Sequence, residues 1–261
     1  MRRLKVNVLS AVALSIAICC SSCAGGGAAA VPETGLPASE EPVALRVACF
    51  IDYSRSTPKS GVMQPQPAEF GELLSLVERR GGELAVGIIC EKSSLPLLRV
   101  ELSQEPAPQA RKPPECGNAF LRERAAAEYK AAKQQDEERM AEWRDENHKR
   151  MERFRGPLTQ LLNRTVTANR TDVFGAVQRA AMFLAEPSTT WRKPPLRFAL
   201  FVTDGIDDVG SQRVELPEGT TLILVGGSGG AGALSYLKPV VVESFGAGIR
   251  YLAHIVEEKG D

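Results

Sequence analysis

Residues 43–51, VALRVACFI, form a nearly continuous apolar run, and the polar stretch DYSRS follows at residues 52–56. An apolar run of this kind is typical of a central strand in a parallel sheet, because helices cover both faces of such a strand. Polar groups directly after it lie at the carboxyl end of the strand, where open α/β sheets place their ligand sites. This stretch therefore predicts both a fold class and the position of a functional site.

The rest of the chain alternates between the two kinds of apolar pattern. Residues 68–79, 173–185 and 249–256 have the spacing of amphipathic helices. Further strands are expected at residues 84–90, 95–102, 196–202, 221–225 and 240–245. This order predicts an α/β fold over residues 43–261, with a doubly wound, mostly parallel six-stranded sheet and helices on both faces.

Two more polar motifs fall in the same layer of the predicted fold. Thr171 precedes the helix at 173–185, and Asp204 follows the strand at 196–202. Together with the first motif they supply five oxygen ligands of the kind that Mg2+ or Mn2+ prefers: Asp52, Ser54, Ser56, Thr171 and Asp204. The sequence therefore predicts a metal-binding site.

Each motif alone has a simpler interpretation. The DYSRS stretch is also typical of a turn capped by its own side chains. Thr171 has the position of a helix N-cap, and Asp204 with Gly205 fits an ordinary turn after a strand. The metal hypothesis depends on all three motifs occurring together.

In order and placement the motifs resemble those of the von Willebrand factor type A (vWA) family. Its metal-ion-dependent adhesion site (MIDAS) combines DxSxS, a threonine and an aspartate, and the strings FIDYSRS, TDVFGAVQRA and FALFVTDG fit its patterns. The resemblance implies a Rossmann-like binding domain without enzymatic activity. It also implies Mg2+ (or Mn2+) held by the five residues, with a carboxylate of a protein partner completing the coordination. One departure is residues 57–66, where Pro58, Gly61 and Pro65 replace the usual start of the first helix.

The N-terminus has the organisation of a lipoprotein signal. Residues 1–22 contain a basic start, an apolar run too short for a stable membrane span, and small residues before Cys23. Cys23 is the expected lipidation site, and residues 23–42 have the composition of a flexible tether. These features predict a membrane-anchored lipoprotein on the periplasmic or cell-surface side.

Residues 104–162 look like an insertion. A densely charged helix is expected at 118–155, with a weak apolar stripe that recurs every eleven residues and is interrupted at Asp136 and Asn147. The weak stripe predicts a helix that the core does not require. Two interpretations stay open for it: a solvated helix packed on its own domain, or an arm for partner binding or coiled-coil self-association.

Charge and cysteines limit the remaining functions. The 261-residue chain has a formal net charge of zero, which argues against nucleic acid as a partner. Cys49 is expected in the core, whereas Cys90 and Cys116 are a possible disulfide in an oxidising compartment.

Two rival functions are less consistent with the motifs. The first is a scaffold with a vestigial metal site that binds partners through the long helix. The second is a phosphatase similar to haloacid dehalogenases, with Asp52 as nucleophile. That family needs a second aspartate where this chain has Ser54.

Overall fold

A computed structural model describes residues 42–91, 95–110, 119–165, 168–188, 190–191, 193–210, 212–226 and 231–259. Residues Glu40–Asp261 form one compact unit. Its strands are β1 (Leu45–Asp52), β2 (Gly82–Ile89), β3 (Leu98–Leu102), β4 (Leu196–Val202), β5 (Thr220–Val225) and β6 (Val240–Val242). Its helices are α1 (Ser56–Lys59), α2 (Pro67–Arg80), α3 (Ala119–Leu162), α4 (Val173–Ala185), the 3-10 helix η1 (Gly232–Leu237) and α5 (Phe245–Lys259).

The six strands form one sheet in the order β3-β2-β1-β4-β5-β6. Only β3 is antiparallel to its neighbour, so the predicted doubly wound, mostly parallel fold is confirmed. Every residue of β1 is buried, as expected for a central strand. The register pairs Ile51 of β1 with Val202 of β4, and the residues that follow these two strands therefore meet at one edge of the sheet.

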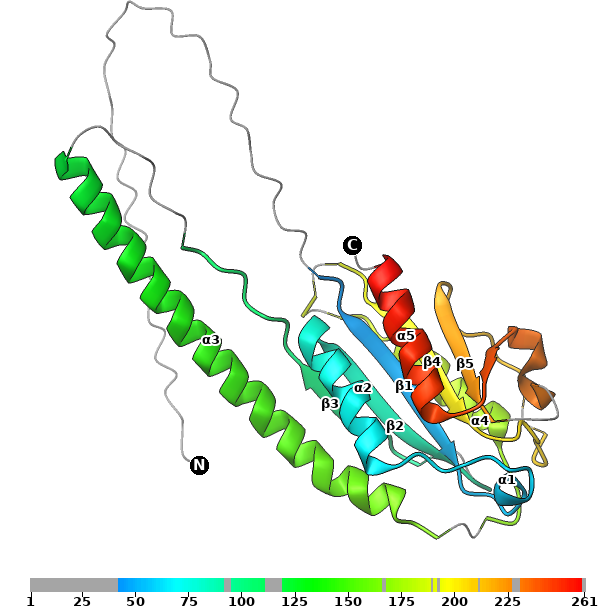
Figure 1. Cartoon of the computed structure of the whole chain (residues 1–261). Coiled ribbons are helices and arrows are strands. Elements are labelled where there is room, and N and C mark those ends of the chain that lie inside the picture. Colours follow the sequence, from blue (N-terminus) through cyan, green and yellow to red (C-terminus); the bar gives the residue numbers. More distant parts are fainter. Residues whose placement is uncertain are drawn as a thin grey trace, which may run out of the picture. The chain divides into compact units, whose positions relative to one another are not determined.

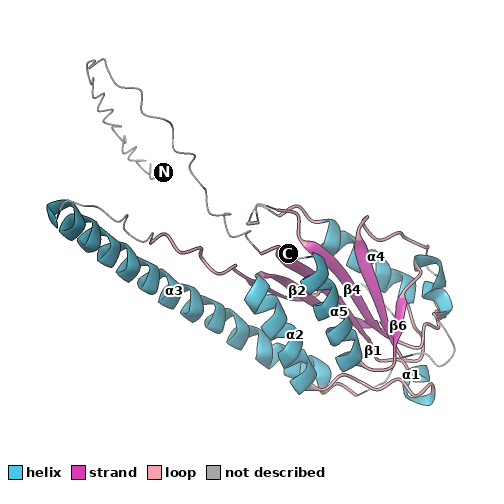
Figure 2. Cartoon of the chain, turned by 45° about the horizontal axis from the view of Figure 1, so that its top comes forward, coloured by secondary structure: helices cyan, strands magenta, loops and turns pink. Residues whose placement is uncertain are grey.

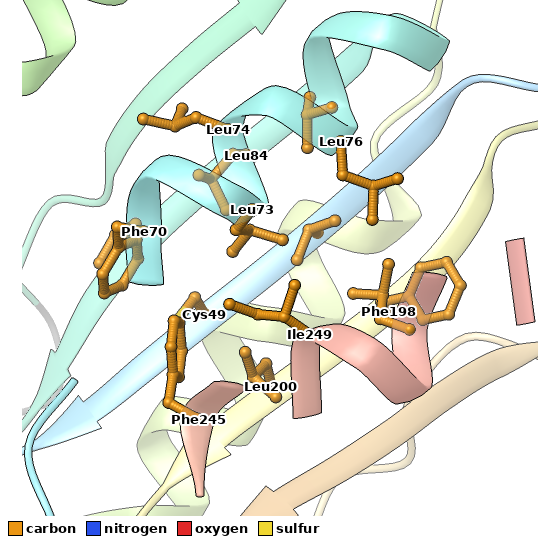
Figure 3. Close-up of a cluster of buried hydrophobic side chains, with 14 of the residues drawn as sticks. Cys49, Phe70, Leu73, Leu74, Leu76, Leu84, Phe198, Leu200, Phe245 and Ile249 are labelled. Carbon is orange, nitrogen blue, oxygen red and sulfur yellow. The ribbon is translucent and has the colours of Figure 1, made fainter. Parts of the chain in front are cut away.

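Helices cover both faces of the sheet (Figures 1 and 2). On one face, α2 and α5 contribute Phe70, Leu73 and Ile249 to the core around Cys49 and other sheet residues (Figure 3). On the other face, α4 packs against the alternate residues of β1 and β4. Cys49 is completely buried, which confirms it as a core residue, and burial raises the pKa of its thiol.

The 44-residue α3 is present as expected but extends further than predicted, to Leu162. Met151, Phe154 and Leu158 are buried and belong to the same core cluster as α2 and α5. The prediction that the core does not require this helix is therefore wrong for its last four turns. Its earlier turns are mostly exposed and extend past the sheet (Figure 1).

The extended segment 103–110 runs along α3, and we call it the strap. The Asn147 side chain accepts hydrogen bonds from the backbone N–H and hydroxyl of Ser103 and donates one to its carbonyl. Asp136, eleven residues earlier, accepts from the N–H groups of Gln109 and Ala110. The two interruptions of the apolar stripe are therefore the residues that bind the strap.

The last turns of α3 also lie against the antiparallel edge of the sheet. Arg150 donates to the carbonyl of Glu101 in β3 at 3.1 Å. The indole of Trp143 donates to the carbonyl of Ser103, directly after β3, at 2.9 Å. Side chains of α3 therefore form hydrogen bonds with backbone groups along this edge.

Candidate functional site

The fold brings the predicted ligands to the carboxyl edge of β1 and β4. Asp52 is the last residue of β1, and Ser54 and Ser56 follow it in the loop and in the single turn of α1. Asp204 lies just after β4, and Thr171 lies just before α4. The segment that the sequence marked as a departure, residues 57–66, forms only that one helical turn before α2 begins.

Two buried carboxylates lie near each other at this edge. One oxygen of Asp52 accepts the backbone N–H of Ser54, and the other accepts the hydroxyl of Thr203, both at 2.7 Å. Asp204 accepts the hydroxyl of Ser60 at 3.0 Å and the N–H of Ile206 at 3.1 Å. All four donors are neutral, and within the described residues neither carboxylate forms an ion pair.

The electrostatics of this edge favour a bound cation. Asp52 is completely buried and Asp204 is 9% exposed. Burial raises the pKa of Asp52, and the nearby charge of Asp204 raises it further, while the hydrogen bonds from Thr203 and Ser54 act in the opposite direction. Buried charges in proteins are normally paired or coordinate a metal, and among the described residues neither carboxylate has a positive partner.

The hydroxyl groups of the site divide into paired and unpaired ones. The Ser54 Oγ lies 2.9 Å from the Ser56 Oγ and 3.1 Å from the Thr57 Oγ1. The Thr171 Oγ1, in contrast, is buried and has no hydrogen-bond partner among the described residues. A buried polar atom without a partner calls for an explanation, and coordination of an ion by this oxygen is one.

The helix-cap interpretation of Thr171 is wrong. The N-cap of α4 is Asp172, whose side chain accepts the N–H of Gly175 at 2.9 Å. Asp207 accepts the N–H of Val173 at 2.8 Å and that of Phe174 at 3.3 Å. The first turn of α4 therefore does not use the Thr171 hydroxyl.

The turn interpretation of Asp204 agrees with the backbone after β4. Gly205 has a φ of +72°, the left-handed conformation that favours glycine, so a tight turn does follow β4. This turn leaves the Asp204 side chain at the same edge as Asp52, and it can therefore serve as a turn residue and as a ligand.

The chemistry of these donors fits a hard divalent cation. Every donor is a carboxylate or hydroxyl oxygen, the ligand type of Mg2+ and Mn2+. Among the described residues, no three His, Cys, Asp or Glu side chains gather in a way that could hold a metal. Binding here would therefore depend on the hydroxyls of Ser54, Ser56 and Thr171 as much as on the two carboxylates.

Three contributors to the site were missed from the sequence. Thr203 and Ser60 donate to the two carboxylates, and Asp207 holds the start of α4. Thr203 directly precedes Asp204, which was a usable signal. Ser60 and Asp207 carry no such signal, because their roles depend on contacts between segments far apart in the chain.

The rim of the site is exposed and mixed in character. Arg55 lies between the two serines of the motif, and the large apolar side chains of Met63 and Ile206 are exposed on the adjacent loops. Cys90, directly after β2, is half-buried. Cys116 lies outside the described residues, as do Cys23 and most of the tether, so these expectations stay predictions.

In the part of the chain that the structure describes, no helix combines the length and apolarity needed to cross a membrane. Comparison with protein-family models gives no match, and nor does a sequence comparison with curated proteins.

Comparison with solved structures does give matches, at low identity. Proximal thread matrix protein 1 (PTMP1) from the mussel byssus is 11% identical over 82% of this chain, with a TM-score of 0.36. A form of PTMP1 described with a zinc-occupied MIDAS motif is 13% identical, with a TM-score of 0.35. The SpRpn10 VWA domain is 9% identical over 80% of this chain and 95% of its own, with a TM-score of 0.35. This chain spans 47% of the length of PTMP1.

Proposed function

We propose that the chain is a metal-dependent protein-binding domain for adhesion or assembly, displayed from a membrane by a lipid anchor. Its metal ligands would be Asp52, Ser54, Ser56, Thr171 and Asp204, binding directly or through water. The ion would be Mg2+ or Mn2+, and the partner would be a protein that offers a carboxylate to the metal.

The observation that carries this proposal is the unpaired hydroxyl of Thr171. It is buried at the same sheet edge as two carboxylates that have no cation among the described residues. One divalent ion would satisfy the hydroxyl and offset the repulsion between Asp52 and Asp204 together. No neutral hydrogen-bonding group would do both.

The chain's own residues would prepare the site in two ways. Thr203 and Ser60 fix the orientation of the two carboxylates by donating one hydroxyl hydrogen bond to each. The exposed Arg55, Met63 and Ile206 at the rim offer a positive charge and apolar surface to an acidic segment of the partner. A bound ion supplies the positive charge that attracts a carboxylate, and with only two charged ligands that charge is not over-neutralised.

A metal titration followed by thermal unfolding tests the site. Metal at about 100 times its Kd should stabilise the folded domain by about 2.7 kcal/mol. Mn2+ should replace Mg2+ well, and Ca2+ less well, because Ca2+ prefers longer bonds and more ligands. Identical melting curves in EDTA and in millimolar Mg2+ or Mn2+ would contradict the proposal.

Two variants test whether the stabilisation by metal arises at the candidate ligands. Asp204→Ala should fold and lose most of the metal response. Asp208→Ala is the matched control, because its carboxylate is exposed and makes no side-chain hydrogen bond or ion pair within the described residues. Asp207→Ala is unsuitable as a control, since Asp207 holds the start of α4.

The lipid anchor is a separate part of the proposal. It rests on the basic, apolar, small-residue and cysteine order of residues 1–23. A Cys23→Ala variant should lose fatty-acid labelling and appear in the soluble fraction. Continued labelling of that variant would place the acceptor elsewhere.

Two other functions are outcomes of the same experiments. The exposed, charged first turns of α3 favour a scaffold that binds partners through this helix, including a second copy of the chain. A partner retained equally in EDTA and in Mg2+ would support that function. Mg2+-dependent phosphate release from a phosphomonoester, abolished by Asp52→Asn, would support the phosphatase instead.

A further inference from the structure

Tyr53 occupies the second position of the DYSRS motif but faces away from the candidate ligands. Its ring belongs to the core cluster that includes the buried residues of α3, and its hydroxyl donates to the carbonyl of Leu161 at 2.7 Å. Burial raises the pKa of this phenol to about 12, so it remains a hydrogen-bond donor at neutral pH. The motif is therefore tied through Tyr53 to the last turn of α3.

The backbone beside Tyr53 makes a second connection to the chain that leaves α3. The carbonyl of Tyr53 accepts the N–H of Ala168 at 3.2 Å, and the N–H of Arg55 donates to the carbonyl of Ala168 at 3.1 Å. These two bonds form a parallel bridge between Ser54 and Ala168. The segment after α3 therefore lies directly along the DYSRS motif.

This segment continues to Thr171 only three residues later. The segment is held just after Thr171, where the N–H of Asp172 donates to the carbonyl of Cys90, the residue that follows β2, at 3.1 Å. It is also held by the loop after β4, where the N–H of Asp208 donates to the carbonyl of Thr171 at 2.9 Å. The bridge at Ala168 thus connects the two serines to the segment that holds Thr171.

We infer that Tyr53 is a positioning residue for the metal site, setting the hydroxyls of Ser54 and Ser56 against that of Thr171 by holding the DYSRS stretch against the end of α3. This inference rests on the proposed metal site. The requirement for such a residue is physical, because Mg2+ demands nearly octahedral geometry at about 2.0–2.1 Å and tolerates little displacement of its ligands. Tyr53 itself touches neither the ion nor the partner.

Tyr53→Phe is the variant that tests the inference, since it removes one hydroxyl and keeps the ring in the core. Tyr236→Phe is its matched control: the Tyr236 hydroxyl makes the same kind of bond, to the carbonyl of Val214 at 2.8 Å, and neither residue belongs to DYSRS or to α3. The measurements use residues 40–261, which form a compact unit of their own. Calorimetric titration with Mg2+ and Mn2+ gives the Kd, and thermal unfolding in EDTA gives the stability without metal.

Both variants should lose similar stability in EDTA, because each loses one hydrogen bond to a backbone carbonyl. Only Tyr53→Phe should also raise the Kd for the metal, by about fivefold if metal binding loses the full free energy of that hydrogen bond. Hydrogen exchange of the metal-free protein should become faster at the Arg55 and Ala168 amides in Tyr53→Phe and stay unchanged in Tyr236→Phe.

The outcomes separate this inference from the proposed function. Suppose that the wild-type domain binds metal, that Tyr53→Phe binds it with a Kd within twofold of the wild-type value, and that exchange at the Ala168 amide is unchanged. This result would overturn the inference and leave the metal site standing. A wild-type domain without any metal response would overturn the proposed function. The exchange rates of the Arg55 and Ala168 amides would then still decide whether Tyr53 holds the DYSRS stretch against α3.

Discussion

The two parts of α3 differ in how much of their surface is buried, although they form one continuous helix. In residues 147–162, Met151, Phe154 and Leu158 are buried in the main core. In residues 119–146, charged side chains pair along the exposed helix surface, as Arg124 does with Glu128. Such exposed pairs contribute little to stability, whereas buried apolar residues contribute several kcal/mol each. A helix can therefore be an insertion in the sequence and still be part of the core at one end.

Deletion of each part should have very different effects. Replacing residues 105–160 with a flexible linker should abolish cooperative unfolding, because it removes three core residues. Replacing only residues 108–138 should preserve it, because Arg139 donates to the carbonyl of Ala107 and these two points can be joined by a short linker. Calorimetry distinguishes the two products. Loss of folding in the shorter deletion would mean that the outer turns are structural as well.

Substitution of one phenylalanine in each part of α3 makes the same comparison with single side chains. Phe154 is 3% exposed, and Phe154→Ala should lower the free energy of unfolding by about 3–5 kcal/mol. Phe120 is 71% exposed, and Phe120→Ala should change it by less than about 0.5 kcal/mol. Urea denaturation gives the free energy of unfolding of both variants. Equal losses of this free energy would contradict the difference between the two parts of α3.

The strap offers a smaller contrast between its two attachment points. Asn147 is completely buried, and Asn147→Ala should cost about 1–3 kcal/mol because the N–H and hydroxyl of Ser103 lose their partner. Asp136→Ala should lower the melting temperature less, since solvent can replace its bonds to Gln109 and Ala110. The order of the two melting temperatures is the test, and the reverse order would place the main attachment at Asp136.

The smallest expected effect concerns pH. Hydrogen bonds from Ala110 and Gln109, and the Arg139 guanidinium, hold the pKa of Asp136 below its ordinary value. A lowered pKa in the folded state means that the strap contact is fully present above the ordinary Asp pKa and is lost as pH falls through the lowered one. NMR of the Gln109 and Ala110 amides between about pH 6 and pH 2 would follow this. Asp136→Asn should remove the pH dependence.

Much of the fold was predictable because single segments determine it. The apolar run at 43–51 indicated a central strand, and β1 is central and buried. The boundaries were less predictable: α3 continues through Gly156 and Pro157, and α5 begins at Phe245, where a strand had been expected to end. In both places packing between distant segments determines where the element ends.

The candidate site, like the fold, was predictable only in part. The five candidate ligands were identifiable because each directly adjoins a strand or helix that the sequence predicts. The hydroxyls that orient the carboxylates, and the choice of Asp172 over Thr171 as helix cap, depend on three-dimensional contacts. The interruptions at Asp136 and Asn147 looked like defects in a stripe, because the strap that they bind is 26 to 44 residues away in sequence.

The contacts between α3 and β3 have a consequence for the behaviour of the domain when many copies are crowded together. An open sheet edge presents unpaired backbone groups to which a strand of another molecule can add, and this is a common route to aggregation. Here Arg150 occupies the carbonyl of Glu101, and Asn147 occupies both backbone groups of Ser103. At the opposite edge, β6 is only three residues long. The charged helix thus takes the place of a seventh strand and makes edge-to-edge aggregation unfavourable.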